Sequence, residues 1–327
     1  MMKYRKLGET GISVSEIGFG AWGIGGLSNG ATSYGKTSDA ESRKALRRAF
    51  EKGITFFDTS DLYGYGHSER LIGETLKDVR EKIAIASKVG FLEHNGPQDF
   101  SSKHIKASAE KSLRRLRTDY LDLYQLHSPA MDLLKEGGAI EALQDLKREG
   151  KIRAFGISAR SPGDGLAAIK LGFQSIQTNF SLVDQRALEC GLFGACRARG
   201  VGVICRTPLC FGFLAGNYAN MEFDSRDHRS SWPPEQRDLW ANAYKTFLLA
   251  VKKNGDQTNA QFALRYCLSY PAVSSTIPGM LTSAEVDENA GASELTPFSE
   301  TELAKLQGTY RDHSFFIRKT GTSKAEA

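Results

Sequence analysis

The sequence has few cysteines, and they follow no metal-binding or disulfide spacing. There are five of them, an odd number, and none forms a CxxC pair. A disulfide framework or a zinc site would need paired cysteines, so neither is expected, and the thiols should be free in a reducing compartment. Cys210 falls in a loop considered below as part of a ligand site. A packing role is the simpler expectation for it, with oxidation as the alternative.

Long apolar runs and a strong excess of charge are also lacking. No uninterrupted apolar stretch reaches the roughly 18 residues of a membrane span, and no signal-peptide pattern is present at the start. The net charge is only +5, and no basic stripe is interleaved with aromatic residues. These absences argue against membrane insertion and against nucleic-acid binding. We therefore expect a cytoplasmic protein whose partner is a small molecule.

The sequence does contain a regular alternation of short apolar runs and amphipathic stretches. With 327 residues, 40% of them hydrophobic, the chain is long enough for one large core. Strands that alternate with helices predict parallel strands joined by right-handed crossovers, and eight such units predict a single (β/α)8 barrel over residues 1–327. Turn residues Gly8 and Gly11, between two extended runs, predict an N-terminal hairpin across the barrel floor. The expected strands are 16–20, 55–58, 83–88, 121–127, 152–158, 175–178, 202–206 and 273–277.

Two irregular stretches and one aromatic residue are candidates for the walls of a site. Residues 211–234, rich in Gly, Asn, Asp and Ser, are too long for an ordinary connection and predict a lid. Trp22, just past the first run, is expected to form a wall of a substrate pocket. A helix near the C-terminus is followed by a tail in which Phe315 and Phe316 are expected to close another side. The last ten or so residues are expected to be disordered.

Four polar residues stand at or near the ends of the apolar runs. Asp58, Lys88 and His127 fall at or just after run ends, and Tyr63 follows Asp58 by a few residues. The carboxyl ends of barrel strands meet on the face where catalysis is normally built. Each residue alone could be a helix cap, a loop aromatic or a buried histidine. The four together, in this order, predict an active site.

These four side chains suit the reduction of a carbonyl group. A tyrosine normally titrates near ~10, so Lys88 is expected to lower the pKa of Tyr63. Asp58 is expected to keep the buried Lys88 charged. A neutral His127 would orient a substrate carbonyl and stabilise the negative charge that develops on its oxygen. None of the four can supply hydride, so the chemistry requires a nicotinamide cofactor.

With these residues in this order, the sequence resembles the aldo-keto reductase superfamily, and in particular its bacterial branch that is similar to the β subunits of potassium channels. The resemblance implies a (β/α)8 barrel, an NAD(P)H-dependent reductase of aldehydes or ketones, Tyr63 as the proton donor, and no metal. It covers nearly the whole chain. The segments that carry it include FFDTSDLYGYGHSERLIGETL (56–76), KIRAFGISA (151–159), SIQTNFSLVDQR (175–186) and TPLCFGFLAG (207–216).

The resemblance also implies a set of cofactor-binding residues, with two departures near the nicotinamide. Similar proteins place an asparagine after the serine that matches Ser158, but here the residue is Ala159. Arg206 replaces an aromatic residue that often stacks on nicotinamide. A guanidinium can stack on the ring or bind a phosphate; if it stacks, its charge would favour the reduced cofactor over the oxidised one. The cofactor-binding residues implied are Gly20, Ser158, Gln177, Arg206, Thr207, Pro208, Leu209, Gly212, Arg229, Gly279, Glu285, Glu288 and Asn289.

The residues at the adenosine end leave the choice of cofactor open. The family habit is NADP(H), which is favoured here because Arg226 and Arg229 could hold a 2′-phosphate. NAD(H) is the alternative, because Leu281 and Glu285 occupy positions where similar proteins place polar or basic groups, and Asn217 replaces a common lysine. A carboxylate near the ribose repels a 2′-phosphate.

Two other classes of function stay open. The protein could be a regulatory subunit that binds the cofactor and senses its redox state with little turnover. A barrel lyase or hydrolase could also use the same face, but it would leave the cofactor segments unexplained.

Overall fold

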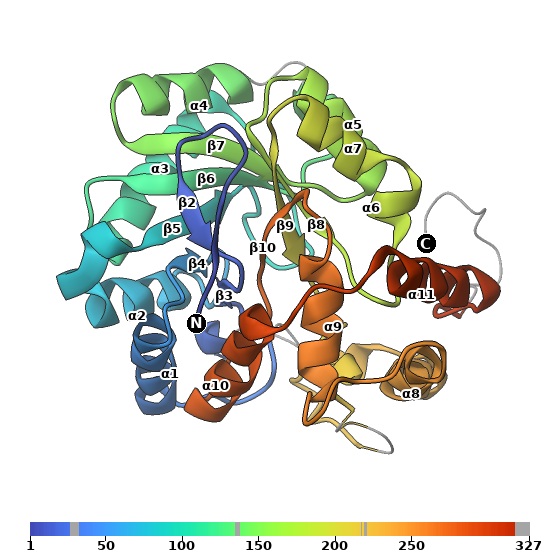
Figure 1. The fold of residues 1–327 in the computed structure, drawn as a ribbon. Helices are drawn as coiled ribbons and strands as arrows, with labels where there is room; N and C mark the ends of the chain where they lie inside the picture. Colours follow the sequence, from blue (N-terminus) through green and yellow to red (C-terminus); the bar gives the residue numbers. More distant parts are fainter. Residues whose placement is uncertain (27–32, 135–137, 217, 219–220, 318–327) are drawn as a thin grey trace.

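The structure, a computed structural model, describes residues 1–26, 33–134, 138–216, 218 and 221–317. Within these residues, eight strands form one parallel sheet in the order β10-β9-β8-β7-β6-β5-β4-β3 (Figure 1). The strands are β3 (Phe19–Gly20), β4 (Phe56–Asp58), β5 (Ala84–Val89), β6 (Leu121–His127), β7 (Ile152–Ser158), β8 (Ser175–Asn179), β9 (Gly202–Arg206) and β10 (Val273–Thr276). The predicted barrel is confirmed, and three of the eight predicted strands have the observed bounds.

The first and last strands meet and close the sheet into a barrel. Parallel bridges join Ile17 to Thr276 and Gly20 to Gly279. A side chain at Gly20 would place its Cβ 2.7 Å from the carbonyl oxygen of Ile277, so this close approach requires glycine. The strand predicted at 16–20 is therefore short in the structure because its first part pairs by single bridges.

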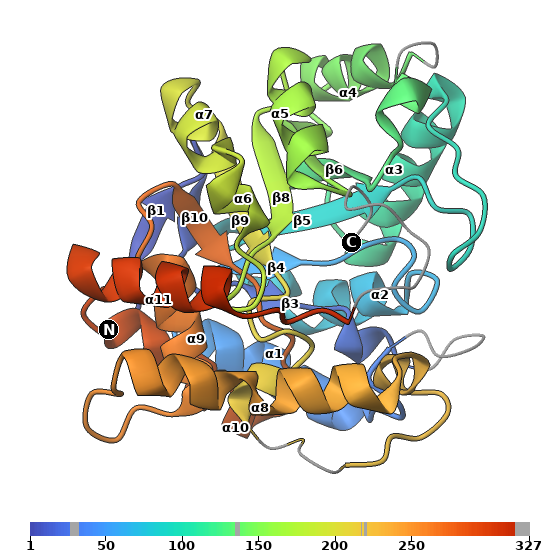
Figure 2. The same cartoon turned by 90° about the vertical axis from the view of Figure 1, so that its right-hand side faces the viewer.

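Helices follow the strands and surround the sheet (Figure 2). Thr258 and Gln261 form a capping box at the start of α9, and Thr282 and Glu285 form one at the start of α10. The helices are α1 (Asp39–Glu51), α2 (His67–Thr75), α3 (Ser102–Leu116), α4 (Ala139–Arg148), α5 (Pro162–Lys170), α6 (Arg186–Glu189), α7 (Leu192–Ala198), α8 (Pro234–Ala250), α9 (Asn259–Leu268), α10 (Ser283–Gly291) and α11 (Glu300–Asp312). None of them, in the part of the chain described, is long and apolar enough to cross a membrane.

The N-terminal hairpin fills the floor of the barrel, as predicted. Strands β1 (Tyr4–Lys6) and β2 (Ser13–Ser15) pair antiparallel. Leu7, Ile12 and Val14 of this segment belong to one buried cluster with inward-facing strand residues such as Phe56 and Leu123. Because these side chains block the amino end of the barrel, a ligand has access only from the carboxyl end.

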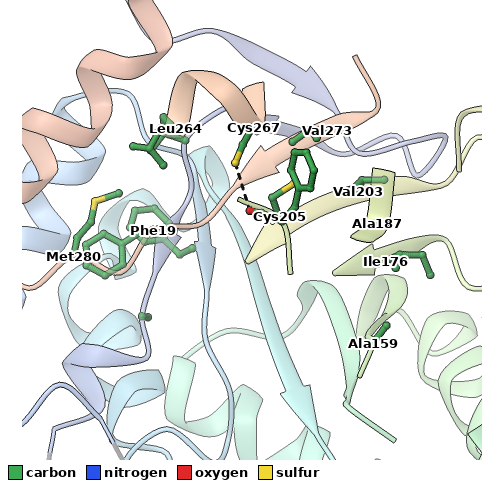
Figure 3. Packing of buried hydrophobic residues seen from close by; sticks show 14 of the residues in the cluster. Phe19, Ala159, Ile176, Ala187, Val203, Cys205, Leu264, Cys267, Val273 and Met280 are labelled. Carbon is green, nitrogen blue, oxygen red and sulfur yellow. Dashed lines mark hydrogen bonds between the residues drawn. The ribbon is translucent and has the colours of Figure 1, made fainter. Parts of the chain in front are cut away.

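A second and larger hydrophobic cluster lies between the sheet and the helices (Figure 3). There Ile176 of β8 and Val203 of β9 are fully buried, as are Leu264 and Cys267 of α9. Cys267 donates a weak hydrogen bond to the carbonyl oxygen of Phe180. The buried cysteines therefore behave as small packing residues, and all five cysteines are free.

The chain after α11 packs on α8. Gln236 of α8 donates to the carbonyl oxygen of Phe315 at 3.0 Å and accepts from the amide of Ile317 at 2.9 Å. Phe315 stacks on Phe247, with ring centroids 5.1 Å apart, and Phe316 lies against Trp240. Neither phenylalanine is among the described residues that line the cavity on the carboxyl face, so the prediction that both close the substrate pocket is wrong. Both pack instead on the apolar surface of α8. The tail predicted to be disordered, 318–327, lies outside the described residues.

Candidate active site

The strand ends meet at a cavity of about 480 Å³ on the carboxyl face of the barrel. Asp58 ends β4, His127 ends β6, and Tyr63 lies in the turn that follows β4; all three line the cavity. Lys88, near the end of β5, lies behind them and is fully buried. The structure thus brings together the four residues predicted from the strand ends.

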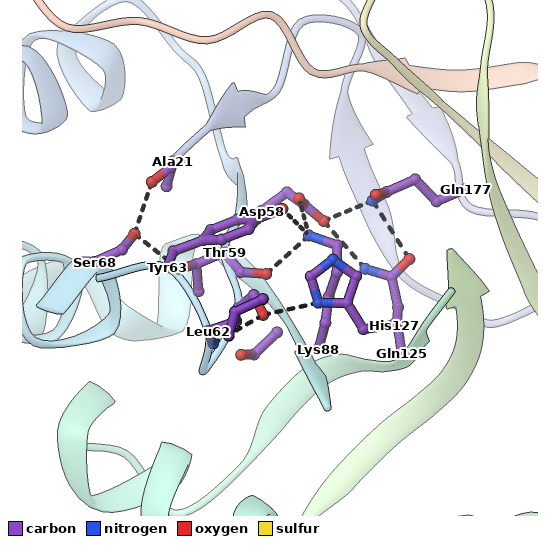
Figure 4. Close-up of polar contacts among 12 residues, drawn as sticks. Ala21, Asp58, Thr59, Leu62, Tyr63, Ser68, Lys88, Gln125, His127 and Gln177 are labelled. Atoms are coloured by element: carbon purple, nitrogen blue, oxygen red, sulfur yellow. Dashed lines mark hydrogen bonds and ion pairs between the residues drawn. The ribbon is translucent and has the colours of Figure 1, made fainter. Parts of the chain in front are cut away.

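Every hydrogen of the Lys88 ammonium has an acceptor (Figure 4). The amine donates to Asp58, to the carbonyl oxygen of Thr59 at 2.9 Å, and to the Tyr63 hydroxyl at 3.2 Å. The second oxygen of Asp58 accepts from Gln125 at 3.1 Å and from Gln177 at 2.8 Å. A buried ion pair is stable only when its remaining hydrogen-bonding groups are satisfied in this way.

Burial and charge act in opposite directions on the lysine and the tyrosine. Burial disfavours the charged form of Lys88, but the Asp58 charge and the hydrogen bonds to Asp58 and Tyr63 outweigh it and raise the pKa of the amine. For Tyr63, burial is the largest effect and raises the pKa of the phenol, although Lys88 lowers it in part. The predicted net lowering of the Tyr63 pKa is therefore wrong. The phenol stays protonated at neutral pH, and its hydroxyl lies beside the Lys88 ammonium.

His127 is neutral, as predicted. Burial and the nearby charges of Lys88 and Arg206 hold the pKa of its imidazole well below the usual range. Its Nδ1 lies 3.1 Å from the hydroxyl oxygen of Ser60, and its ring packs edge-on against Tyr63 and Phe91. These contacts fix the plane of the ring and leave Nε2 for a ligand in the cavity.

The loop after β9 forms another part of the cavity wall, and its backbone is strained. Thr207, Cys210 and Phe211 have φ values of 53°, 46° and 57°, which non-glycine residues rarely adopt. Such strain is typical of functional sites. Cys210 is buried, and burial raises the pKa of its thiol well above the usual range, so the alternative of a reactive thiolate is not supported.

Arg206 lines the cavity next to this loop. Its Nη2 donates to the carbonyl oxygen of Ala159 at 2.9 Å, so the guanidinium lies beside the position where similar sequences have an asparagine. Its Nε is buried with no hydrogen-bond partner among the described residues. A buried donor without a partner favours a polar or anionic ligand at this place.

The predicted cofactor residues lie almost entirely around the same cavity. Ser158 is the exception: it is buried at the end of β7, in register with Gln177, and is not among the described lining residues. Gln177 lines the cavity, although its amide nitrogen is engaged by Asp58. The lining residues from that set are Gly20, Gln177, Arg206, Thr207, Pro208, Leu209, Gly212, Arg229, Gly279, Glu285, Glu288 and Asn289.

The far end of the cavity is bounded by the start of α10. One carboxylate oxygen of Glu285 accepts from the backbone amides of Leu281 at 2.6 Å and Thr282 at 3.1 Å. Glu285 is thus part of a capping box, a role that the sequence analysis did not assign to it. Glu285 still lines the cavity together with Leu281 and Glu288, so two acidic residues lie at this end.

Two later residues of the segment after β9, His228 and Arg229, also line the cavity. The amide of His228 donates to the carbonyl oxygen of Ser33 at 2.7 Å, and single bridges join Asp227 to Ser33 and Tyr34. The rings of Tyr34 and His228 pack against Trp22 at 5.1 and 5.0 Å. Trp22 also lines the cavity, and its role as a wall of a substrate pocket stays a prediction. Tyr34 and His228 were missed, because no spacing in the sequence indicates that two distant loops meet.

The two arginines of this loop are paired with neighbouring aspartates. Arg229 lines the cavity, but Asp227 accepts from its Nε at 2.9 Å and from its Nη2 at 2.7 Å. Arg226 makes the same type of contact with Asp224 on the surface and does not line the cavity. Asn217 lies outside the described residues.

Comparisons with known proteins match most of the chain. The family model described as Aldo/keto reductase family matches residues 16–311. The uncharacterized oxidoreductase YqkF of Bacillus subtilis is 32% identical over 312 residues, covering 94% of this chain and 96% of that protein. L-galactose dehydrogenase of Arabidopsis thaliana is 31% identical, covering 89% of this chain and 88% of its own. The holo form of aldo-keto reductase AKR11C1 from Bacillus halodurans superposes with a TM-score of 0.76 at 29% identity and covers 100% of this chain and 99% of that one.

Proposed function

We propose, from the premise that this chain belongs to the aldo/keto reductase family, that Asp58, Tyr63, Lys88 and His127 carry out its chemistry in the cavity described above. Family membership makes the protein an NAD(P)H-dependent oxidoreductase that acts on a small carbonyl compound. The observation that carries the residue assignment is the saturated Lys88 ammonium, which joins Asp58 to the Tyr63 hydroxyl at the cavity wall.

The cavity suits a nicotinamide dinucleotide. The residues that would hold it are Gln177 and Arg206 at one end, the strained loop from Thr207 to Gly212 in the middle, and Asn289 with Gly279 at the other. The Nε of Arg206 supports this fit, because it is a buried donor without a partner among the described residues and could donate to an oxygen of the cofactor. When bound, the cofactor supplies the hydride.

The side chains of this protein then bind the carbonyl and supply a proton. His127 is neutral, and in the tautomer with its hydrogen on Nε2 it donates a hydrogen bond to the substrate oxygen and orients that oxygen next to Tyr63. The Tyr63 hydroxyl gives its proton to that oxygen as negative charge develops there. Lys88 stabilises the phenolate that is left, and Asp58 keeps Lys88 charged throughout.

The test compares Tyr63→Phe with a matched control, Tyr65→Phe. Tyr65 is the neighbouring tyrosine in the chain and is 46% exposed. The purified proteins are titrated with NADPH and NADH by fluorescence, and reduction of a panel of aldehydes and ketones is followed by absorbance. We expect Tyr63→Phe to bind cofactor like the wild type but to lose turnover, whereas the control keeps both. Turnover by Tyr63→Phe would refute the assignment, and cofactor binding without turnover in the wild type would favour a regulatory subunit.

For the choice of cofactor we propose NADH over NADPH. The sequence favoured NADP(H) on the strength of Arg226 and Arg229, but each has its own aspartate partner in the structure. Glu285 and Glu288 line the end of the cavity that the family resemblance assigns to the adenosine, and they add negative charge there. A free 2′-hydroxyl fits this end better than a phosphate.

Glu285→Gln tests this choice without removing the helix cap. Glutamine keeps the capping-box geometry but has no charge. Loss of one nearby charge near the surface is worth about 1 kcal/mol, so the ratio of NADPH to NADH affinity should rise roughly fivefold. Leu281→Arg, which adds a cation and leaves Glu285 in place, should raise the ratio further. An unchanged ratio in both variants, or a wild type that prefers NADPH, would contradict the proposal.

A further inference from the structure

The hydroxyl of Ser60 lies between the ring of His127 and the carboxylate of Asp61. Its oxygen is 3.1 Å from His127 Nδ1 and 3.2 Å from Asp61 Oδ1. The backbone amide of Leu62 also donates to it, at 3.1 Å. Ser60 is fully buried, so water does not compete for these contacts.

Ser60 has only one hydrogen to share between these two neighbours. If the hydroxyl donates to Asp61, the contact with His127 must run from an Nδ1–H to the serine oxygen. The neutral imidazole then has no hydrogen on Nε2. If the hydroxyl donates to Nδ1, the imidazole hydrogen is on Nε2, where it can bind a carbonyl oxygen.

We propose that Ser60 sets the tautomer of His127 and that Asp61 acts through Ser60 as a positioning residue for carbonyl binding. This inference rests on the proposed role of His127 as the hydrogen-bond donor to the substrate. When Asp61 is ionised, it takes the serine hydrogen, and His127 carries its hydrogen on Nδ1. When Asp61 is protonated, its carboxyl group donates a hydrogen bond to the Ser60 oxygen, and the Ser60 hydroxyl in turn donates to Nδ1. The imidazole then gives up its Nδ1 proton to solvent and takes one from solvent on Nε2.

The groups around both residues support such a switch near neutral pH. Burial and the carboxylate of Glu69 on α2 raise the pKa of Asp61 to about 7, against the opposing effect of Arg115 on α3. Tyr124 of β6 faces the same group of side chains, and its hydroxyl has no partner among the described residues.

His127 itself does not gain charge in this range. Burial keeps its pKa low, as do Lys88 of β5, Arg206 of β9 and His94 in the loop after β5. Its ring therefore has one hydrogen throughout, and the position of that hydrogen is what changes. The carbonyl-binding form should dominate below about pH 7 and decline above it.

The direct test is the ¹⁵N NMR signal of His127, because the shifts of Nδ1 and Nε2 distinguish the two tautomers. Protein with ¹⁵N-labelled histidine is measured from pH 5.5 to 8.5 without cofactor or substrate, and His127→Gln assigns the signal. We expect the wild type to pass from Nε2–H to Nδ1–H with a midpoint near the Asp61 pKa. Asp61→Asn and Ser60→Ala should each make the tautomer independent of pH.

Ser68→Ala is the matched control for loss of a buried hydroxyl. Ser68 bonds to Thr59 and to the carbonyl oxygen of Ala21, away from His127, so this variant should titrate like the wild type. A second measurement is kcat/KM for carbonyl reduction, which should fall up to tenfold per pH unit above the midpoint in the wild type but less steeply in Asp61→Asn.

A wild-type tautomer that does not change with pH, or an Asp61→Asn variant that titrates like the wild type, would overturn the inference. The NMR result does not depend on turnover, so the inference can fail while the proposed reductase function stands. Failure of the proposed function would instead appear in the Tyr63 experiment, as turnover by Tyr63→Phe or as a wild type that binds cofactor without turnover.

Discussion

Asp58→Asn should destabilise the protein strongly, because it removes the charge that compensates a fully buried ammonium. Lys88 has no exposed surface, and burial is the largest single influence on its pKa. Breaking a buried ion pair by neutralising one partner typically costs about 3–5 kcal/mol. Asparagine keeps the size of the side chain and one acceptor oxygen, so the loss measures the charge rather than a cavity.

The size of this loss should depend on pH. Without Asp58, burial lowers the pKa of Lys88 in the folded variant, while the unfolded chain keeps the ordinary value near ~10.4. The unfolded state then binds more protons, so the free energy of unfolding rises with pH by up to about 1.4 kcal/mol per unit between the two pKa values. In the wild type the sign is opposite: the raised pKa of Lys88 gives stability that is lost only as pH rises through that value.

Urea unfolding at pH 7 and pH 9.5 measures both effects. We expect Asp58→Asn to lose less stability at the higher pH, and the double variant Asp58→Asn with Lys88→Met to recover part of the loss at pH 7. Asp78→Asn, on the surface next to Arg47, is the control and should change stability little. A single variant within about 1 kcal/mol of the wild type at both pH values would refute the picture of a charge held by Asp58.

Three further outcomes follow from single contacts. Arg206→Ala should raise the pKa of His127 in an NMR titration and weaken the preference for reduced over oxidised cofactor in fluorescence titrations; equal ratios before and after would dismiss that preference. Arg5→Lys should cost about 2–3 kcal/mol in urea unfolding, because one guanidinium binds Glu16 and three carbonyl oxygens, but turnover should not change. Gly64→Ala should reduce turnover sharply, because its Cβ would lie 2.2 Å from the carbonyl oxygen of Gly25 and displace the Tyr63 turn; a fully active variant would show that the turn adapts.

The fold and the four catalytic candidates could be predicted from the sequence because both depend on local pattern. The period of the apolar residues defined the strands, and strand ends in a barrel meet on one face. The capping role of Glu285 follows equally local rules, since Thr282 precedes it by three residues, and it was overlooked.

What the sequence could not predict depends on contacts between distant segments. The sign of the Tyr63 pKa shift follows from how deeply the phenol is buried, which no spacing reveals. The contact of Trp22 with His228 joins two loops that lie far apart in the sequence, after β3 and after β9. Phe315 packs on Phe247 of α8 because the chain turns back after α11. The sequence after α11 has no helical period, and this absence did not indicate where the chain would turn.

The closure of the barrel between its first and last strands has a consequence for biosynthesis. Gly20 pairs with Gly279, and Arg5 binds the carbonyl oxygen of Val273, 268 residues later. A ribosome must therefore make most of the chain before β3 finds its neighbour β10. Until then β3 and the strand most recently made present unpaired edges, which are sites of aggregation. We expect nascent chains that stop before β10 to depend on chaperones, and full-length chains to be released from them once the ring closes.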